Sequence, residues 1–116
     1  MKKWIESSVY DLVVATAADY RRMKRLMNEG NITLEQAVVF AKRIAAVEHA
    51  LIVACKGEGE RVREAMLTDI AERRGFERSV SKKYYPARAT FVRRKEHAVC
   101  LIAELLGLLE DGNEPK

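Results

Sequence analysis

Apolar residues recur three and four positions apart along nearly the whole chain, and this spacing limits the fold more than any other feature of the sequence. The first such series consists of Ile5, Val9, Leu12, Thr16, Tyr20, Met23 and Met27, with Thr16 as its one hydroxyl. Residues at this spacing share one face of an α-helix, so an amphipathic helix is expected over residues 5–29. The runs DLVV and AVVF lie inside the same periodicity. No β-strand is expected, and the chain is predicted to be all-α.

Short breaks divide the apolar series into separate helices. Gly30 suits the left-handed residue that follows a helix, and the sequence TLEQ at residues 33–36 fits a capping box at the start of the next one. The sequence KGEGE then interrupts the pattern, and Gly75 is expected to end the third helix. The three helices expected from these signals span residues 5–29, 34–56 and 60–74.

The step from Tyr85 to Pro86 divides the last part of the chain in two. Proline disfavours the α conformation in the residue before it, so a short helix from Phe76 should end at Tyr84 or Tyr85. Proline is acceptable at the first position of a helix, so a longer helix is expected to follow. Its inward side chains are predicted to be Phe91, Ala98, Leu101, Ile102, Leu105 and Leu108.

The second helix is apolar around most of its circumference. A helix that packs on one neighbour needs a single apolar stripe, but this one has three. It is therefore expected to pack against the first helix on one side and against the C-terminal helices or a second subunit on the other. Residues 1–57 are predicted to form an antiparallel helical hairpin, and residues 58–116 a three-helix unit that shares one core with it. A homodimer is expected.

The basic residues are concentrated in one window of the sequence. The chain has a formal net charge of +4, but residues 61–95 hold eleven Lys/Arg against four Asp/Glu, whereas residues 96–116 hold one against five. Such a concentration indicates a polyanionic partner such as nucleic acid. A solvated helix surface is the alternative interpretation of the same charges.

A short helix, a sharp break and a longer helix with a basic start form the arrangement of a helix-turn-helix, in which the second helix enters the major groove. Val80 and Tyr84 are expected to pack against Phe91, with the small Ser81 allowing close approach. At the start of the second helix, Arg88 and Arg93 are predicted to read bases. The predicted phosphate contacts flank them and are Arg78, Lys82, Lys83 and Arg94.

These residues carry a family resemblance. The segment FERSVSKKYYPARATFVRRKEHAVCLIAELLGLL resembles the C-terminal half of small phage and prophage transcriptional regulators related to the autolysin regulatory protein, whose helix-turn-helix is similar to sigma factor region 4. The run that opens the recognition helix is matched at Arg88, Thr90, Phe91, Arg93 and Arg94, and the helix before it at Val80, Ser81 and Tyr84. The resemblance implies binding to promoter DNA and regulation of late phage genes.

The segment departs from the family pattern at the turn between the two helices. Tyr85 stands where glycine is usual, and Pro86 and Ala87 stand where a hydrophobic residue and a serine usually follow. The constraint that Pro86 places on Tyr85 is another way to stop the first helix. The hydroxyl of Tyr85 is a further candidate to donate a hydrogen bond to a phosphate.

Other chemistry has little support in the sequence. Cys55 and Cys100 lie in apolar helical patterns without a CxxC pair, so they are expected in the core and no metal site or cofactor is predicted. No catalytic set occurs at a recognisable spacing, so an enzyme is not expected. The chain opens without a signal-peptide pattern or a long apolar run, which predicts a cytoplasmic protein that is not embedded in a membrane.

The sequence leaves two other functions open. The chain could be an adaptor that binds RNA polymerase or another protein through its second helix. A small DNA-packaging subunit also combines a helix-turn-helix with an oligomerising hairpin. Binding to double-stranded DNA is the preferred hypothesis over both.

Overall fold

The computed structural model describes residues 5–109, and this part of the chain is helical without any strand. The all-α prediction is therefore confirmed. The described part contains four α-helices and two short 3-10 turns: α1 (Ser7–Glu29), α2 (Leu34–Ala54), α3 (Glu60–Ala71), η1 (Phe76–Arg78), η2 (Val80–Lys83) and α4 (Arg88–Leu105).

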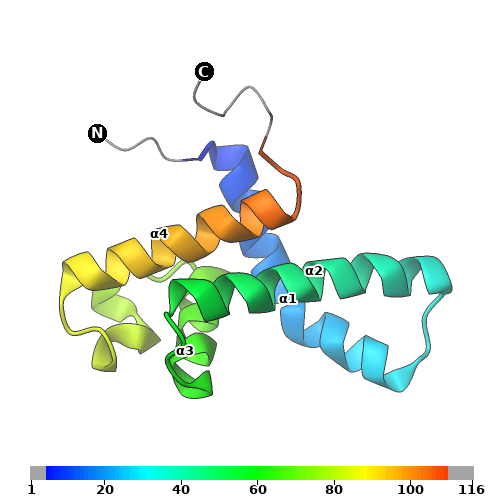
Figure 1. The fold of residues 1–116 in the computed structure, drawn as a ribbon, viewed down its shortest axis with the longest axis horizontal. Coiled ribbons are helices and arrows are strands. Elements are labelled where there is room, and N and C mark those ends of the chain that lie inside the picture. The colour runs from blue at the N-terminus through cyan, green and yellow to red at the C-terminus, as the bar shows by residue number, and fades with distance from the viewer. Residues whose placement is uncertain (1–4, 110–116) are drawn as a thin grey trace.

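Helix α2 lies side by side with α4, and the two run in opposite directions (Figure 1). Helix α1 crosses behind α2 and also contacts α3 and α4. The second helix thus packs against α1 and α4 together, as its broad apolar surface suggested. The connection from α1 to α2 lies at one end of the long axis, and η1, η2 and the start of α4 lie at the other.

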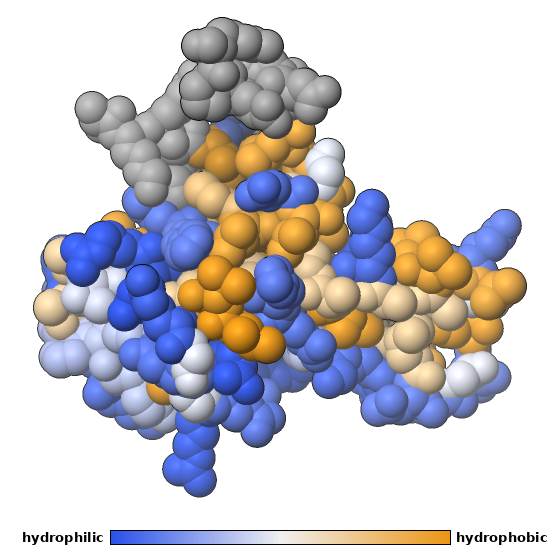
Figure 2. Space-filling view, viewed as in Figure 1, coloured by the Kyte–Doolittle hydropathy of each residue, from blue (hydrophilic) through white to orange (hydrophobic). Residues whose placement is uncertain are grey.

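One side of α2 remains outside these contacts. Figure 2 shows orange and pale orange side chains following α2 across the front of the molecule, with a second apolar group over the C-terminal half of α4. On α2 the most exposed of the large apolar side chains are Leu34, at 81% exposure, and Val38, at 63%.

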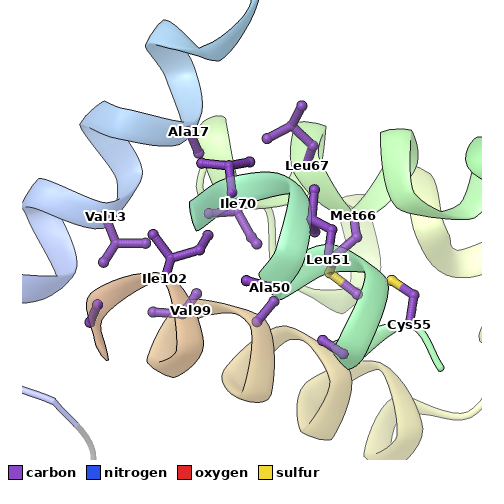
Figure 3. Packing of buried hydrophobic residues seen from close by; sticks show 14 of the residues in the cluster. Val13, Ala17, Ala50, Leu51, Cys55, Met66, Leu67, Ile70, Val99 and Ile102 are labelled. Atoms are coloured by element: carbon purple, nitrogen blue, oxygen red, sulfur yellow. The ribbon is translucent and has the colours of Figure 1, made fainter. Parts of the chain in front are cut away.

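All four α-helices contribute to one core (Figure 3). Each large apolar side chain in it stabilises the fold by about 1.5–3 kcal/mol relative to its exposed state. The labelled core residues are Val13 and Ala17 from α1, Ala50 and Leu51 from α2, Cys55 directly after α2, Met66, Leu67 and Ile70 from α3, and Val99 and Ile102 from α4.

The apolar face of α1 differs from the expected stripe. Leu12 is 52% exposed, whereas Val13 and Ala17 are buried at 0% and 3% exposure. The buried face is set by the packing of α1 against α2, α3 and α4 together, and Val13 and Ala17 belong to the core that these helices share. The prediction for Leu105 is also wrong, since this side chain is 38% exposed.

The end of α1 at Gly30 and the start of α2 at Thr33 follow the sequence signals, whereas α2 ends at Ala54 instead of residue 56 and α3 also ends early. The amide of Gln36 donates to Thr33 Oγ1 at 3.1 Å, and the amide of Thr33 donates to Gln36 Oε1 at 3.0 Å, which confirms the capping box. Helix α3, however, ends at Ala71, and Arg73 rather than Gly75 takes the left-handed conformation, with φ 56°. An ion pair between Arg73 Nη2 and Asp11 Oδ1, at 2.7 Å, fixes this residue against α1.

Candidate nucleic-acid interface

The segment before the Tyr85–Pro86 step is not the short α-helix that the sequence predicted. It forms η1 and η2, with Ser79 extended between them at φ −78° and ψ 144°. The break is explained by Asp69, a fully buried aspartate of α3. Its Oδ1 accepts a hydrogen bond from the Val80 amide at 2.7 Å, and its Oδ2 accepts one from the Ser81 amide at 3.0 Å. This cap from another helix starts a new turn at Val80, so the helix expected from Phe76 cannot run through it.

Tyr85 is a buried anchor with an exposed fraction of only 3%. Its hydroxyl donates a hydrogen bond to the carboxylate of Glu58, in the connection between α2 and α3. Burial, together with this hydrogen bond, raises the pKa of the Tyr85 hydroxyl above its ordinary value. The hydroxyl is engaged inside the protein, which removes it from the candidate phosphate donors.

Further contacts fix the start of α4 against α3. Lys95 Nζ donates to the carbonyl of Arg74 at 3.0 Å, and Arg74 Nη1 donates to the carbonyl of Arg78 at 2.9 Å. The rings of Phe76 and Phe91 lie 5.8 Å apart between their centroids, so Phe76 takes the place expected for Val80. Burial lowers the pKa of the Lys95 ammonium. Arg74 and Lys95 therefore hold the segment together, and their charges are not fully available to a ligand.

Two of the predicted DNA contacts converge on one carboxylate. Glu77 accepts from Lys82 Nζ at 3.3 Å and from Arg88 Nη2 at 2.7 Å, and all three side chains are largely exposed. Both cations also lie over the ring of Phe76, at 5.0 Å for Lys82 and 5.2 Å for Arg88. Residues from both sides of the Tyr85–Pro86 step are thus brought into one group, which we term the Glu77 cluster: Phe76, Glu77, Lys82 and Arg88.

Three other predicted contacts are exposed to solvent. Arg78 ends η1, Lys83 ends η2, and Arg93 lies in the second turn of α4. Within residues 5–109, no ion pair joins any of these three to a carboxylate. They are the cations of the segment that are free to meet an anion without breaking an existing ion pair.

Thr90 and Arg94 are half-buried. The guanidinium of Arg94 lies 5.7 Å from the centroid of the Tyr85 ring, and its Nε is buried without a hydrogen-bond partner. Arg94 thus faces the anchor residue, in a position unlike that of the solvent-facing Arg93. Ser81 is fully buried, in keeping with the close approach expected of a small residue.

Two residues near this surface, Arg61 and Glu77, were not expected from the sequence. A hollow of about 400 Å³ between α3 and η2 is lined by Arg61 as well as by Lys83, with Glu60 and Glu64 beside them. Arg61 lies on a different helix from Lys83, and Glu77 lies on η1 while Arg88 starts α4, so the spacing within one helix carried no signal for Arg61 or Glu77.

The comparisons with known proteins give no family for this chain. No protein-family model, curated protein or solved structure matches it. Between residues 5 and 109, no helix has the length and apolar character needed to cross a membrane.

Proposed function

We propose that the protein binds double-stranded DNA through η1, η2 and the first two turns of α4, as a transcriptional regulator of the phage type that its C-terminal segment resembles. One observation carries the proposal. Exposed cations from both sides of the Tyr85–Pro86 step lie on a backbone that the buried residues Asp69 and Tyr85 hold through their hydrogen bonds. Cations on a fixed backbone can meet phosphates without the entropy cost of ordering a loop.

The start of α4 has a surface suited to a major groove. Ala89 and Arg93 are four residues apart and share the exposed side of the helix, with Val92 beside them at 37% exposure. The small Ala89 allows close approach to the groove, Val92 can contact a thymine methyl group, and Arg93 can make a forked contact with guanine. Arg93 is the proposed base-reading residue.

Arg88 has a different position around the helix. At 3.6 residues per turn, Arg88 and Arg93 point about 140° apart. Arg88 contacts Glu77, so it must exchange this carboxylate for DNA in order to bind. We assign Arg78 and Lys83 to phosphates directly, and Lys82 and Arg88 to the edge of the interface.

Fluorescence anisotropy with duplex DNA over a series of salt concentrations tests the proposal. If the protein binds phosphates with these residues, Arg78→Ala/Lys83→Ala should reduce the slope of log affinity against log salt by about 2. Arg25→Ala, at an exposed arginine of α1, is the control and should leave the slope unchanged. No binding at low salt, or equal effects of the double variant and the control, would refute the proposal.

Base reading is tested separately, by selection from a pool of random duplexes. The wild-type protein should enrich one motif, and Arg93→Ala should weaken binding to it by about 1–3 kcal/mol while relaxing the preference at one position. An unchanged motif with Arg93→Ala contradicts the base-reading role. Circular dichroism establishes that each variant is folded.

Glu77→Gln gives a test with the opposite sign. Removing this carboxylate releases Lys82 and Arg88 and removes a negative charge from the surface, so DNA binding should become about 3- to 10-fold tighter at low salt. Glu29→Gln, at an exposed carboxylate of α1, is the matched control. Weaker binding by Glu77→Gln than by the wild type contradicts a DNA surface at the Glu77 cluster.

A further inference from the structure

The outward side of α2 carries a row of apolar and small residues. Steps of three, four and seven residues place them on one line of the helix, at the spacing seen where two helices pack together. We term this row the α2 stripe: Leu34, Val38, Ala41, Ala45 and Ile52. All five are exposed, and Ile52 is still 49% exposed.

The α2 stripe has no role in the core of its own chain. The opposite side of α2 carries Val47, Ala50 and Ala54, which are fully buried against the other helices. A helix that packs only within one chain keeps polar residues on its outer side. Contiguous apolar residues on that side are typical of a protein interface.

We propose that the α2 stripe is the contact between two copies of this chain, with the two α2 helices antiparallel and crossing at Ala45. A twofold contact uses the same patch on both subunits, so the patch must be complementary to itself. Reversal about Ala45 places Val38 of one copy opposite Ile52 of the other. Large residues then meet at both ends, and small residues meet at the centre.

Two polar residues, Glu48 and His49, lie beside the row between Ala45 and Ile52. Glu48 accepts hydrogen bonds from Tyr20 and Lys24 of its own chain, and His49 fits the same pairing. His49 is exposed and lies one turn beyond Ala45. In the antiparallel arrangement it lies opposite Ala41 of the second copy, whose methyl group leaves room for the imidazole. The ring can keep its outer edge in water, so the contact buries no unpaired polar group.

Charges at the two ends of the stripe select the antiparallel direction. Glu35 lies at the start of α2 and Lys56 just after its end, and both are exposed. Antiparallel helices bring Glu35 of one copy near Lys56 of the other at both ends. Parallel helices would place like charges together and align the two helix dipoles unfavourably.

The size of the stripe sets the expected strength. From Leu34 to Ile52 the row is about 27 Å long at 1.5 Å per residue. A helix pair of this length buries roughly 500 Å² per copy, near the lower limit for a specific interface. The dimer is therefore expected to dissociate in the micromolar range rather than to be permanent.

Sedimentation velocity of the full chain without DNA tests this interface. The wild type should change from monomer to dimer between about 1 µM and about 500 µM, a range suited to a contact of this area. Ala45→Arg places two guanidinium groups together at the centre and should weaken the dimer at least about tenfold. Ala18→Arg, at an exposed alanine of α1, should associate as the wild type does.

Further variants keep the test independent of whether Ala45→Arg folds. Glu35→Lys should weaken the dimer about fivefold through repulsion with Lys56, and Glu35→Lys/Lys56→Glu should restore it. Under mild oxidation, Ala45→Cys should give a disulfide-linked dimer whereas Ala18→Cys should not.

The proposal is overturned if the wild type is a monomer at about 500 µM, because an interface of this size should associate at that concentration. The stripe would then bind another protein or have no partner. It is also overturned by a dimer that Ala45→Arg and Ala18→Arg weaken equally, or by equal cross-linking of the two cysteine variants. Because no DNA is present, these results do not depend on the proposed function.

Discussion

Replacing Asp69 with asparagine is expected to destabilise the protein by about 3 kcal/mol. The carboxylate is fully buried and accepts one backbone amide on each oxygen, at 2.7 Å from Val80 and 3.0 Å from Ser81. Asparagine has nearly the same shape but only one acceptor oxygen. Its amino group would face the second backbone N–H, donor against donor, in a site closed to water.

The magnitude follows from these two contacts. A hydrogen bond to a charged group contributes about 1.5–3 kcal/mol, and a buried donor left without a partner costs about 1–3 kcal/mol. One bond is lost and the other becomes neutral, which together gives about 3 kcal/mol. For 116 residues the unfolding entropy is about 0.24 kcal/mol/K, so the melting temperature should fall by about 12 °C.

Thermal and urea unfolding measure this effect, with Asp11→Asn as the matched control. Asp11 is 62% exposed and pairs with Arg73 at 2.7 Å, so its replacement should cost less than about 1 kcal/mol. Hydrogen exchange should show that the amides of Val80 and Ser81 lose protection in Asp69→Asn. A loss of stability within 0.5 kcal/mol of the Asp11→Asn value, taken as roughly the error of such measurements, refutes the capping argument.

The remaining predictions concern three other buried or paired groups. Tyr85→Phe removes the hydrogen bond to Glu58 and should cost about 1.5 kcal/mol in urea unfolding, whereas Tyr84→Phe should cost less than about 0.5 kcal/mol. The hydrogen bond from Tyr20 lowers the pKa of Glu48 below its ordinary 4.5, so Glu48 should stabilise the protein above this pH and lose its contribution as the pH falls through the lowered value. The unfolding free energy of Glu48→Gln should therefore differ from that of the wild type by up to about 1 kcal/mol at pH 7 and by progressively less below pH 4.5. Cys55 is fully buried and burial raises the pKa of its thiol, so peptide mapping should show its alkylation at least about 100-fold slower in the native protein than in urea; comparable rates would contradict its burial.

The features of the fold that depend on neighbouring residues could be predicted from the sequence. The capping box at Thr33 and Gln36 and the left-handed Gly30 each involve a few consecutive residues, and both are found as expected. The burial of Phe91, Ala98 and Ile102 follows from helical periodicity alone. Local propensity and a single apolar period were sufficient for these elements.

The features that depend on distant residues could not be predicted. The 3-10 turns replace a helix because Asp69 binds the amides of Val80 and Ser81 from another element. The buried face of α1 is set by its packing against α2, α3 and α4, which leaves Leu12 outside. No pattern within one helix records such packing.

The same limit applies to the candidate site. The sequence supplied the basic residues and the break at Tyr85–Pro86, but not which cations already have partners. Arg88 is paired with Glu77 and Arg94 lies over Tyr85, and in both contacts the partner lies before α4 and outside its helical spacing. Among the predicted contacts in the described chain, only Arg78, Lys83 and Arg93 combine an exposed position with the absence of an ion pair to a carboxylate.

The cap that Asp69 provides also implies an order of folding events. A 3-10 turn as short as η2 has little stability of its own, and its cap lies on a separate helix, eleven residues away from Val80. Residues 76–87 are therefore expected to acquire their conformation after α3 has formed and α4 has docked, with φ-values near zero in the folding transition state. In native-state hydrogen exchange, the opening free energy of their amides should be lower than that of the amides in the middle of α2. Lys82 and Lys83 thus lie in the part of the fold that is expected to form last and open first.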